Sequence, residues 1–392
     1  MDYQRITTAE RLASLCREIV QSDRVGFDTE FVSEDTFRPE LCLVQVVTER
    51  GMSVVDPQKV DDMTPFWQAL ADGEHVTIAH AAREELNFSL TAIERVPVNL
   101  FDTQIACAFC SNEYPAAYAS VVTRILDKKA EKGEQRTDWR RRPLTEAQIN
   151  YALEDVRHLF PLHDKLTAKI DKLDRTSWLE EEMDSFVKEV TAARSRQRWR
   201  RVSGIGNLAP RNLAIVRELW MWRQQEAERR DAPPKRVLRD DLLVELAKRK
   251  TSKPDAIRAV RGMNYRSVKD SIGDIAACVE RGLNAPLDDL KPSRSKAMPS
   301  QLNLLGQVLV PAITSVCRQA NLATSLACTA TDIREMIAHQ LGFGKSKGEE
   351  PPALAQGWRA ELIGSLIDDL LSGRKSIRID DPRSEHPLSL VE

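Results

Sequence analysis

In the first 170 residues, hydrophobic residues recur either at every second position, as in a β-strand, or every three to four positions, as in an α-helix. The two patterns together predict an α/β domain. A helical pattern leads into VGFDTEF, in which apolar and polar residues alternate as they do in a β-strand. LCLVQVV, MSVVD and VTIAH are further short strand-like runs, each bounded by polar residues or by glycine and proline. Helical patterns follow, the last of them in TEAQINYALEDVRHLFPLHDKL. This order predicts a sheet with helices on its faces.

The rest of the chain has mainly helical patterns, which predict two all-α modules. Residues 171–209 predict a charged helical linker that ends in glycines and a proline. Three amphipathic patterns within residues 210–290 predict a small helical domain, and residues 299–392 predict a second helical domain with one short strand in its tail. A chain of 392 residues is long enough for two or three such domains.

The composition is that of a soluble protein, with 42% hydrophobic and 30% charged residues. The sequence shows no apolar run near the ~20 residues of a membrane helix and no apolar core of signal-peptide length, so we expect a cytoplasmic protein with no membrane partner. Seven cysteines, an odd number, argue against a disulfide framework. Cys107 and Cys110 form a Cys-x-x-Cys pair in an apolar stretch, and we expect them to be buried thiols.

The net charge of −2 gives no general sign of nucleic-acid binding, so that function would need a local basic surface. Two arginine-rich runs could supply one, at residues 136–142 and at residues 194–201. The second run could equally be the solvated face of a linker.

Two acidic residues on the predicted strand VGFDTEF are the first candidates for chemistry. Side chains alternate across a strand, so Asp28 and Glu30 project from the same face. Neighbouring carboxylates repel each other unless a cation or a shared proton lies between them. The alternative is a harmless exposed strand face, but the neighbouring run LCLVQVV is apolar on both faces and favours a buried central sheet.

Further oxygen donors occur in two other segments. Tyr151 and Asp155 are four residues apart and share one helical face, although such a pair is common on protein surfaces. Glu84 and Glu85 follow the strand-like run VTIAH, at the kind of strand end where α/β sheets bind ligands. Donor sets made only of oxygen favour Mg²⁺ or Mn²⁺, and two such ions suit phosphodiester hydrolysis.

These motifs carry a family resemblance. The first 165 residues resemble ribonuclease D, in the tyrosine-type branch of the DEDD exonucleases. The resemblance rests on GFDTEF, HAAREEL, LFDTQIA and, above all, on the long block of residues 135–159. The resemblance implies an RNase H-like exonuclease domain with a mixed sheet and helices on both faces. It also implies that Asp28, Glu30 and Asp155 are metal ligands and that Tyr151 orients the attacking water.

The second motif departs from the family pattern. The family usually has an aspartate where this chain has Glu85, which the resemblance still implies as a catalytic residue and metal ligand. We expect Asp102, in the Asp-Thr-Gln motif, to support the site. His80 could orient Glu85 or be a hydrogen-bonded core histidine. The candidate substrate contacts are Gln135, Arg136, Trp139 and Arg142.

The helical patterns after residue 210 resemble an HRDC domain, a small bundle that follows ribonuclease D and some helicase cores. That resemblance implies contact with nucleic acid or a protein partner. Five basic residues could bind phosphates or could form an ordinary helix surface; they are Arg229, Arg230, Lys235, Arg236 and Arg239. Residues 299–392 are a weaker match to a second HRDC-like bundle.

The expected function is therefore a metal-dependent 3′–5′ exoribonuclease. It would use two divalent cations, Mg²⁺ or Mn²⁺, and release 5′-mononucleotides from RNA 3′ ends, with tRNA precursors as the expected substrates. One alternative keeps the site and changes the substrate to DNA, because the metal site contacts only the phosphodiester. The other alternative is a non-catalytic RNA-binding or scaffold protein.

Overall fold

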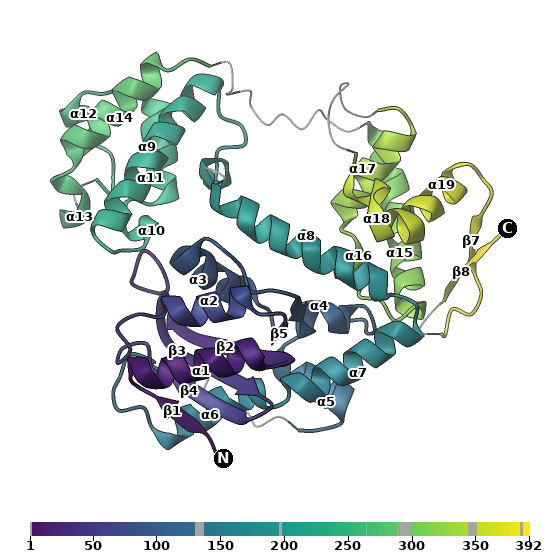
Figure 1. Ribbon diagram of the computed structural model, residues 1–392. Helices are drawn as coiled ribbons and strands as arrows, with labels where there is room; N and C mark the ends of the chain where they lie inside the picture. The colour runs from purple at the N-terminus through teal and green to yellow at the C-terminus, as the bar shows by residue number, and fades with distance from the viewer. Residues whose placement is uncertain are drawn as a thin grey trace. The chain divides into compact units, whose positions relative to one another are not determined.

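The computed structural model describes two compact units (Figure 1). The described residues are 2–129, 137–195, 198–263, 265–287, 290, 299–343, 351–384 and 387–392. The first unit contains Met1–Glu30, Leu41–Ala193 and Met298–Glu392, and the second contains Phe31–Glu40 and Arg194–Ala297. Both units are therefore built from segments that are not continuous in the sequence.

A mixed six-stranded sheet organises the first unit. The strand order is β1-β4-β3-β2-β5-β6. Parallel pairs join β1 to β4, β2 to β5 and β5 to β6, whereas β3 and β4 pair antiparallel. The strands are β1 (Gln4–Ile6), β2 (Arg24–Val32), β3 (Glu40–Thr48), β4 (Gly51–Val55), β5 (Val76–Ala79) and β6 (Leu100–Asp102). The α/β prediction for this part of the chain is confirmed.

Helices cover both faces of the sheet, and the middle residues of β2 and β3 are buried on both sides. On one face, α1 (Ala9–Gln21) and α2 (Thr64–Asp72) form a core with Phe27 of β2 and Val44 of β3. On the other face, α7 (Leu159–Lys172) begins directly over β2. A Cβ atom at Gly26 would lie 2.6 Å from Val47 Cγ1 and 3.0 Å from Leu159 Cδ1, so only glycine permits this close approach.

The other helices between residues 83 and 172 follow the order of the sequence. They are α3 (Arg83–Ile93), α4 (Thr103–Ala108), α5 (Tyr118–Leu126), α6 (Glu146–Arg157) and α7 (Leu159–Lys172). A capping box begins α6, because the Thr145 hydroxyl accepts from the Gln148 backbone N–H and the Gln148 side chain accepts from the Thr145 N–H. This cap fixes the start of the helix that carries Tyr151 and Asp155.

The C-terminal helices share one hydrophobic core with α4, α5, α7 and α8 (Thr176–Ser195). α8, which lies in the region expected to be a charged linker, buries Leu179 and Met183 in that core. The Arg175 guanidinium donates to Phe109 O at 2.6 Å and to Ala320 O at 2.8 Å, which joins the two parts of the chain. The C-terminal elements are α15 (Ser300–Gln319), α16 (Thr324–Ala327), α17 (Ala330–Gln340), a 3₁₀ turn (Ala353–Ala355), α18 (Gly357–Arg359), a π-helical turn (Ala360–Gly364) and α19 (Ser365–Leu371).

By length and composition alone, α15 could cross a membrane. The sequence patterns predicted no such helix. The Leu302, Leu309 and Ile313 side chains of α15 are buried in the core shared with α4, α5, α7 and α8. These residues place one face of α15 in the core, while Leu304 and Val308 on the same helix are exposed.

The chain ends in an antiparallel hairpin of β7 (Ser376–Ile379) and β8 (Leu388–Val391), where the sequence predicted a single strand. Ser315 Oγ on α15 donates to Leu388 O at 3.2 Å. The hairpin is therefore attached to the helices of the first unit.

The second unit contains the three predicted amphipathic helices, α9 (Pro210–Arg229), α11 (Asp240–Arg249) and α14 (Ile272–Asn284). Its core includes a buried ion pair between Arg223 Nη1 and Asp240 Oδ1 at 2.7 Å. The segment Phe31–Glu40 also belongs to this unit: the Phe37 N–H donates to Asp231 Oδ1 at 3.0 Å, and Arg38 pairs with Glu228 at 2.6 Å. Shorter elements complete it, namely a 3₁₀ turn (Arg198–Arg201), α10 (Pro234–Val237), α12 (Pro254–Arg258) and α13 (Arg266–Lys269).

Candidate active site

Three carboxylates from two elements converge in the first unit. Asp28 and Glu30 come from β2 and Asp155 comes from α6, and one oxygen of each lies within 4.8 Å of the others. Strand alternation brings the first two together, and the helix that begins at the capping box delivers the third. Such a set of oxygens can hold a divalent cation.

The pKa values of all three carboxylates are raised, chiefly by burial. Burial, and then the charge of Asp155, raises the pKa of Asp28 to about 8. Burial also raises the pKa of Glu30 to about 9, with Asp28 and Asp155 adding to the effect. The pKa of Asp155 rises to about 7, first from burial and then from Glu154. Full ionisation at neutral pH therefore requires positive charge between these groups, and their donor chemistry fits a hard cation.

Glu85 is nearby but is held differently. Its Oε1 accepts a hydrogen bond from Thr29 Oγ1 at 2.7 Å, and its side chain is only 5% exposed. Burial and the charge of Asp28 raise the pKa of Glu85 to about 8. Among the described residues, Glu85 is not part of the set whose oxygens all lie within 4.8 Å of one another. The sequence did not reveal the role of Thr29, because alternation places it on the opposite face from Asp28.

Asp102 fixes the backbone that precedes Glu85. Its carboxylate accepts from the N–H groups of Ala81 at 3.1 Å and Ala82 at 2.8 Å, and from the Gln104 N–H at 2.8 Å at the start of α4. Ala81 has a φ of 58°, a left-handed conformation that these bonds help to stabilise. Asp102 therefore ties the start of α3 to the start of α4.

His80 is hydrogen-bonded within the core. Its Nε2 lies 3.1 Å from Ala116 O, and its Nδ1 lies 2.9 Å from Thr103 Oγ1. Because a carbonyl can only accept, Nε2 carries the proton, and Thr103 Oγ1 also donates to Ala79 O at 3.2 Å. Both ring nitrogens are therefore used by groups other than Glu85.

Tyr151 lies one helical turn before Asp155 and shares its surroundings. Burial and the nearby charges of Asp155 and Glu30 raise the pKa of the Tyr151 hydroxyl, so this group remains protonated at neutral pH. The buried Trp139 ring lies beside it, with 6.1 Å between ring centroids. The structure thus brings Tyr151 and Trp139 to the carboxylate cluster.

Arg142 has its guanidinium donors occupied by protein acceptors. Its Nε and Nη2 donate to the two Asp56 oxygens at 2.9 and 2.8 Å, and Nη2 also donates to Cys42 O at 2.8 Å. Nη1 donates to Trp139 O at 2.7 Å and to Arg141 O at 3.0 Å. The side chain anchors the segment before α6 to the sheet. Gln135 and Arg136, the other candidate substrate contacts, lie outside the described residues.

Four of the five basic residues considered in the second unit form ion pairs. Arg229 and Arg230 pair with Glu226, Lys235 lies 3.7 Å from Asp240, and Arg239 pairs with Asp241. Within the run at residues 194–201, Trp199 is buried and Arg200 lies over its ring. These contacts account for much of the local positive charge without a ligand.

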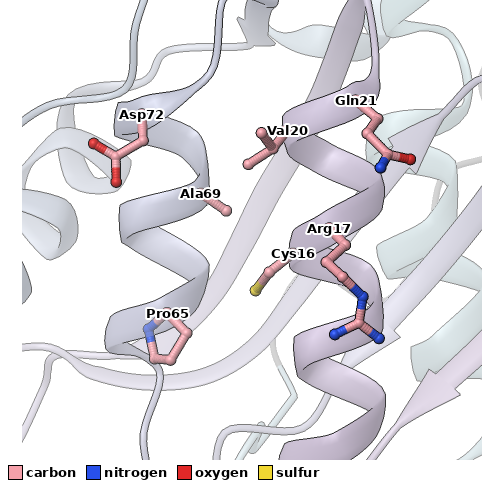
Figure 2. A pocket seen from close by; sticks show the side chains of 7 residues that line it. All are labelled: Cys16, Arg17, Val20, Gln21, Pro65, Ala69 and Asp72. Atoms are coloured by element: carbon pink, nitrogen blue, oxygen red, sulfur yellow. The ribbon is translucent and has the colours of Figure 1, made fainter.

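A surface hollow between α1 and α2 lies on the sheet face opposite the carboxylate cluster (Figure 2). Its lining includes one carboxylate, Asp72, which pairs with Arg95 at 2.7 Å. Cys16 also lines the hollow, and burial raises the pKa of its thiol to about 11. The hollow therefore offers neither an acidic cluster nor a reactive thiolate.

Comparison with protein families gives two matches. Residues 3–171 match the family described as 3′–5′ exonuclease, and residues 212–279 match the HRDC domain. The first range contains all five predicted catalytic residues, and the second covers most of α9 to α14.

Individual relatives match almost the whole chain. Ribonuclease D of Jannaschia sp. is 31% identical over 386 residues, which cover 95% of this chain and 96% of the relative. Ribonuclease D of Pseudomonas paraeruginosa is 30% identical, with 93% of this chain and 96% of the relative covered. The crystal structure of Escherichia coli RNase D, described as an exoribonuclease involved in structured RNA processing, superposes with a TM-score of 0.82 at 28% identity. That alignment covers 95% of this chain and 99% of the other.

Proposed function

The chain belongs to the ribonuclease D family of 3′–5′ exoribonucleases, and we propose that Asp28, Glu30 and Asp155 are its metal ligands. The observation that carries this assignment is the convergence of three partly buried carboxylates within 4.8 Å. The family implies divalent cations, and we propose two ions of Mg²⁺ or Mn²⁺, with Glu85 completing the site. When bound, such ions lower the pKa of an attacking water and offset the charge of the phosphodiester.

The protein side chains would supply position and hydrogen bonds. We propose that the Tyr151 hydroxyl, which stays protonated, donates or accepts one hydrogen bond and orients the attacking water toward the terminal phosphodiester. Trp139 packs beside Tyr151 and would restrict the position of its ring. Asp102 would keep Glu85 in place through the backbone at Ala81 and Ala82.

We propose that the substrates are 3′ ends of structured RNA, including tRNA precursors, and that the products are 5′-mononucleotides. Support comes from the Escherichia coli relative, which is described as acting in structured RNA processing, and from the HRDC match. The carboxylate site contacts only the phosphodiester, so the choice of RNA over DNA must come from contacts with the 2′-hydroxyl.

The direct test is digestion of a 5′-labelled RNA with Mg²⁺ or Mn²⁺. We expect a ladder that shortens by one nucleotide at a time from the 3′ end, 5′-mononucleotides as products, and no hydrolysis in EDTA. A DNA oligonucleotide of the same sequence is the control for substrate class. Faster digestion of DNA would favour the DNA exonuclease alternative, and RNA binding without turnover would favour the scaffold alternative.

Glu85→Gln should reduce the rate at saturating Mg²⁺ by roughly 10- to 100-fold, less than a substitution in the three-carboxylate cluster. The amide keeps the acceptor for Thr29 but removes the charge that would face the cations. Single-turnover rates over a range of Mg²⁺ concentrations measure the effect. A loss as large as that of Asp28→Asn would instead place Glu85 in the same ligand set as Asp28.

A further inference from the structure

Gln45, in the middle of β3, is a buried polar side chain that the carboxylate site does not explain. It is 0% exposed, and neither its Nε2 nor its Oε1 has a hydrogen-bond partner. Buried amides almost always form hydrogen bonds, because leaving them unpaired is costly. An apolar residue would fill this strand position without that cost, so the amide calls for a specific role.

The pairing of β2 and β3 places Gln45 opposite Asp28. These strands are neighbours in the sheet. The Arg24 N–H donates to Glu49 Oε1 at 3.2 Å, and a Cβ at Gly26 would touch Val47. Both contacts fit one antiparallel register, in which residue 24 faces 49 and residue 26 faces 47. Two residues further along β2, the same register brings Asp28 opposite Gln45.

The two side chains also share a face of the sheet. Val44 and Val46, on either side of Gln45, belong to the core under α1 and α2, so Gln45 projects to the other face. Phe27 belongs to that same core, so Asp28 also projects to the other face. Directly opposite residues have Cβ atoms about 4.5–5.5 Å apart, a separation that a glutamine amide can span.

We infer that Gln45 is a positioning residue for Asp28 in the metal-bound protein: when cations occupy the carboxylate site, its Nε2–H donates to one Asp28 oxygen and fixes the other toward the metal ions. The inference rests on the proposed metal site. Gln45 is fully buried, so it acts through Asp28 and not through contact with RNA. Partners of this kind orient metal ligands, and their loss typically weakens metal binding by 10- to 100-fold.

Gln45→Met and Gln45→Leu, which remove the amide in two different shapes, test the inference. Mn²⁺ binding to the full-length protein, measured by electron paramagnetic resonance of the free ion, should weaken by roughly 10- to 100-fold in both variants. Thermal stability without metal should be equal or higher, because an unpaired buried amide is removed. Exonuclease activity should recover as the Mn²⁺ concentration is raised.

Thr77→Val is the matched control. Thr77 is also 0% exposed with an unpartnered Oγ1, but it pairs with Val25 and so lies on the opposite face of the sheet. We expect its Mn²⁺ affinity to equal that of the unchanged protein. An equal loss of affinity in Thr77→Val, or unchanged affinity in the Gln45 variants, would overturn the inference.

Asp28→Asn separates this inference from the proposed function. If Asp28→Asn loses Mn²⁺ binding while Gln45→Met retains it, only the role of Gln45 fails; if Asp28→Asn still binds Mn²⁺ normally, the metal-site assignment fails. Should both Gln45 variants misfold, a Mn²⁺-bound crystal structure of the unchanged protein decides. Gln45 Nε2 within about 3.2 Å of an Asp28 oxygen supports the inference, and a separation beyond about 3.5 Å contradicts it.

Discussion

Asp28→Asn and Asp155→Asn are each expected to reduce RNA hydrolysis by at least about a thousand-fold. Each change removes one negative charge from a cluster in which the three carboxylates lie within 4.8 Å of one another. The amide is nearly the same size, so the fold should be retained while cation binding is lost. The rate lost corresponds to about 4 kcal/mol of transition-state stabilisation, in the range expected for metal-ion catalysis.

Single-turnover digestion of a 5′-labelled RNA at saturating Mn²⁺ measures this loss. Glu84→Gln is the control, because Glu84 neighbours Glu85 in the sequence but hydrogen-bonds to Asn87. We expect this control to retain activity, which would also fix the register of the second motif. Full activity in both aspartate variants would contradict the assignment of the site.

The metal-free protein should lose stability as the pH rises from about 4 to about 9. The pKa of Asp28 rises from 3.8 to about 8, and that of Glu30 from 4.5 to about 9, chiefly through burial. At pH values between the ordinary pKa values and the raised ones, the folded protein binds more protons than the unfolded chain. The free energy of unfolding therefore falls with increasing pH. The total effect is on the order of several kcal/mol.

Thermal unfolding in EDTA at pH 5, 7 and 9 tests this expectation. Asp28→Asn removes one of the repelling charges, so at pH 8 it should unfold at a temperature at least a few degrees higher than the unchanged protein. Added Mn²⁺ should stabilise the unchanged protein more at pH 8 than at pH 5. If the two proteins show the same pH dependence in EDTA, the carboxylates do not repel one another as described.

Local sequence patterns were sufficient for the elements that carry the site. Alternation in β2 placed Asp28 and Glu30 on one face, and the helical spacing of Tyr151 and Asp155 placed them one turn apart. In both cases the relative position of the two side chains depends only on the geometry of a single strand or a single helix. The three main helices of the second unit were predicted for the same reason, because each has a continuous apolar stripe.

Contacts between distant segments could not be read from those patterns. The amphipathic character of α15 showed that one face would be buried, but not that α4, α7 and α8 would cover it. The hydrogen bond from Thr29 to Glu85 joins residues 56 positions apart. The importance of Gln45 depends on the residue opposite it in the sheet, which the run LCLVQVV does not reveal.

The core shared by the catalytic part and the C-terminal helices has a consequence for how the protein can be divided. A fragment that stops near residue 170, where the exonuclease motifs end, would leave the apolar side chains of α4 and α7 without their covering helices. The compact first unit is therefore complete only when residues 298–392 pack with residues 1–30 and 41–193. Removal of the C-terminal helices would therefore expose apolar side chains of that core and lower the stability of the unit that holds the candidate active site.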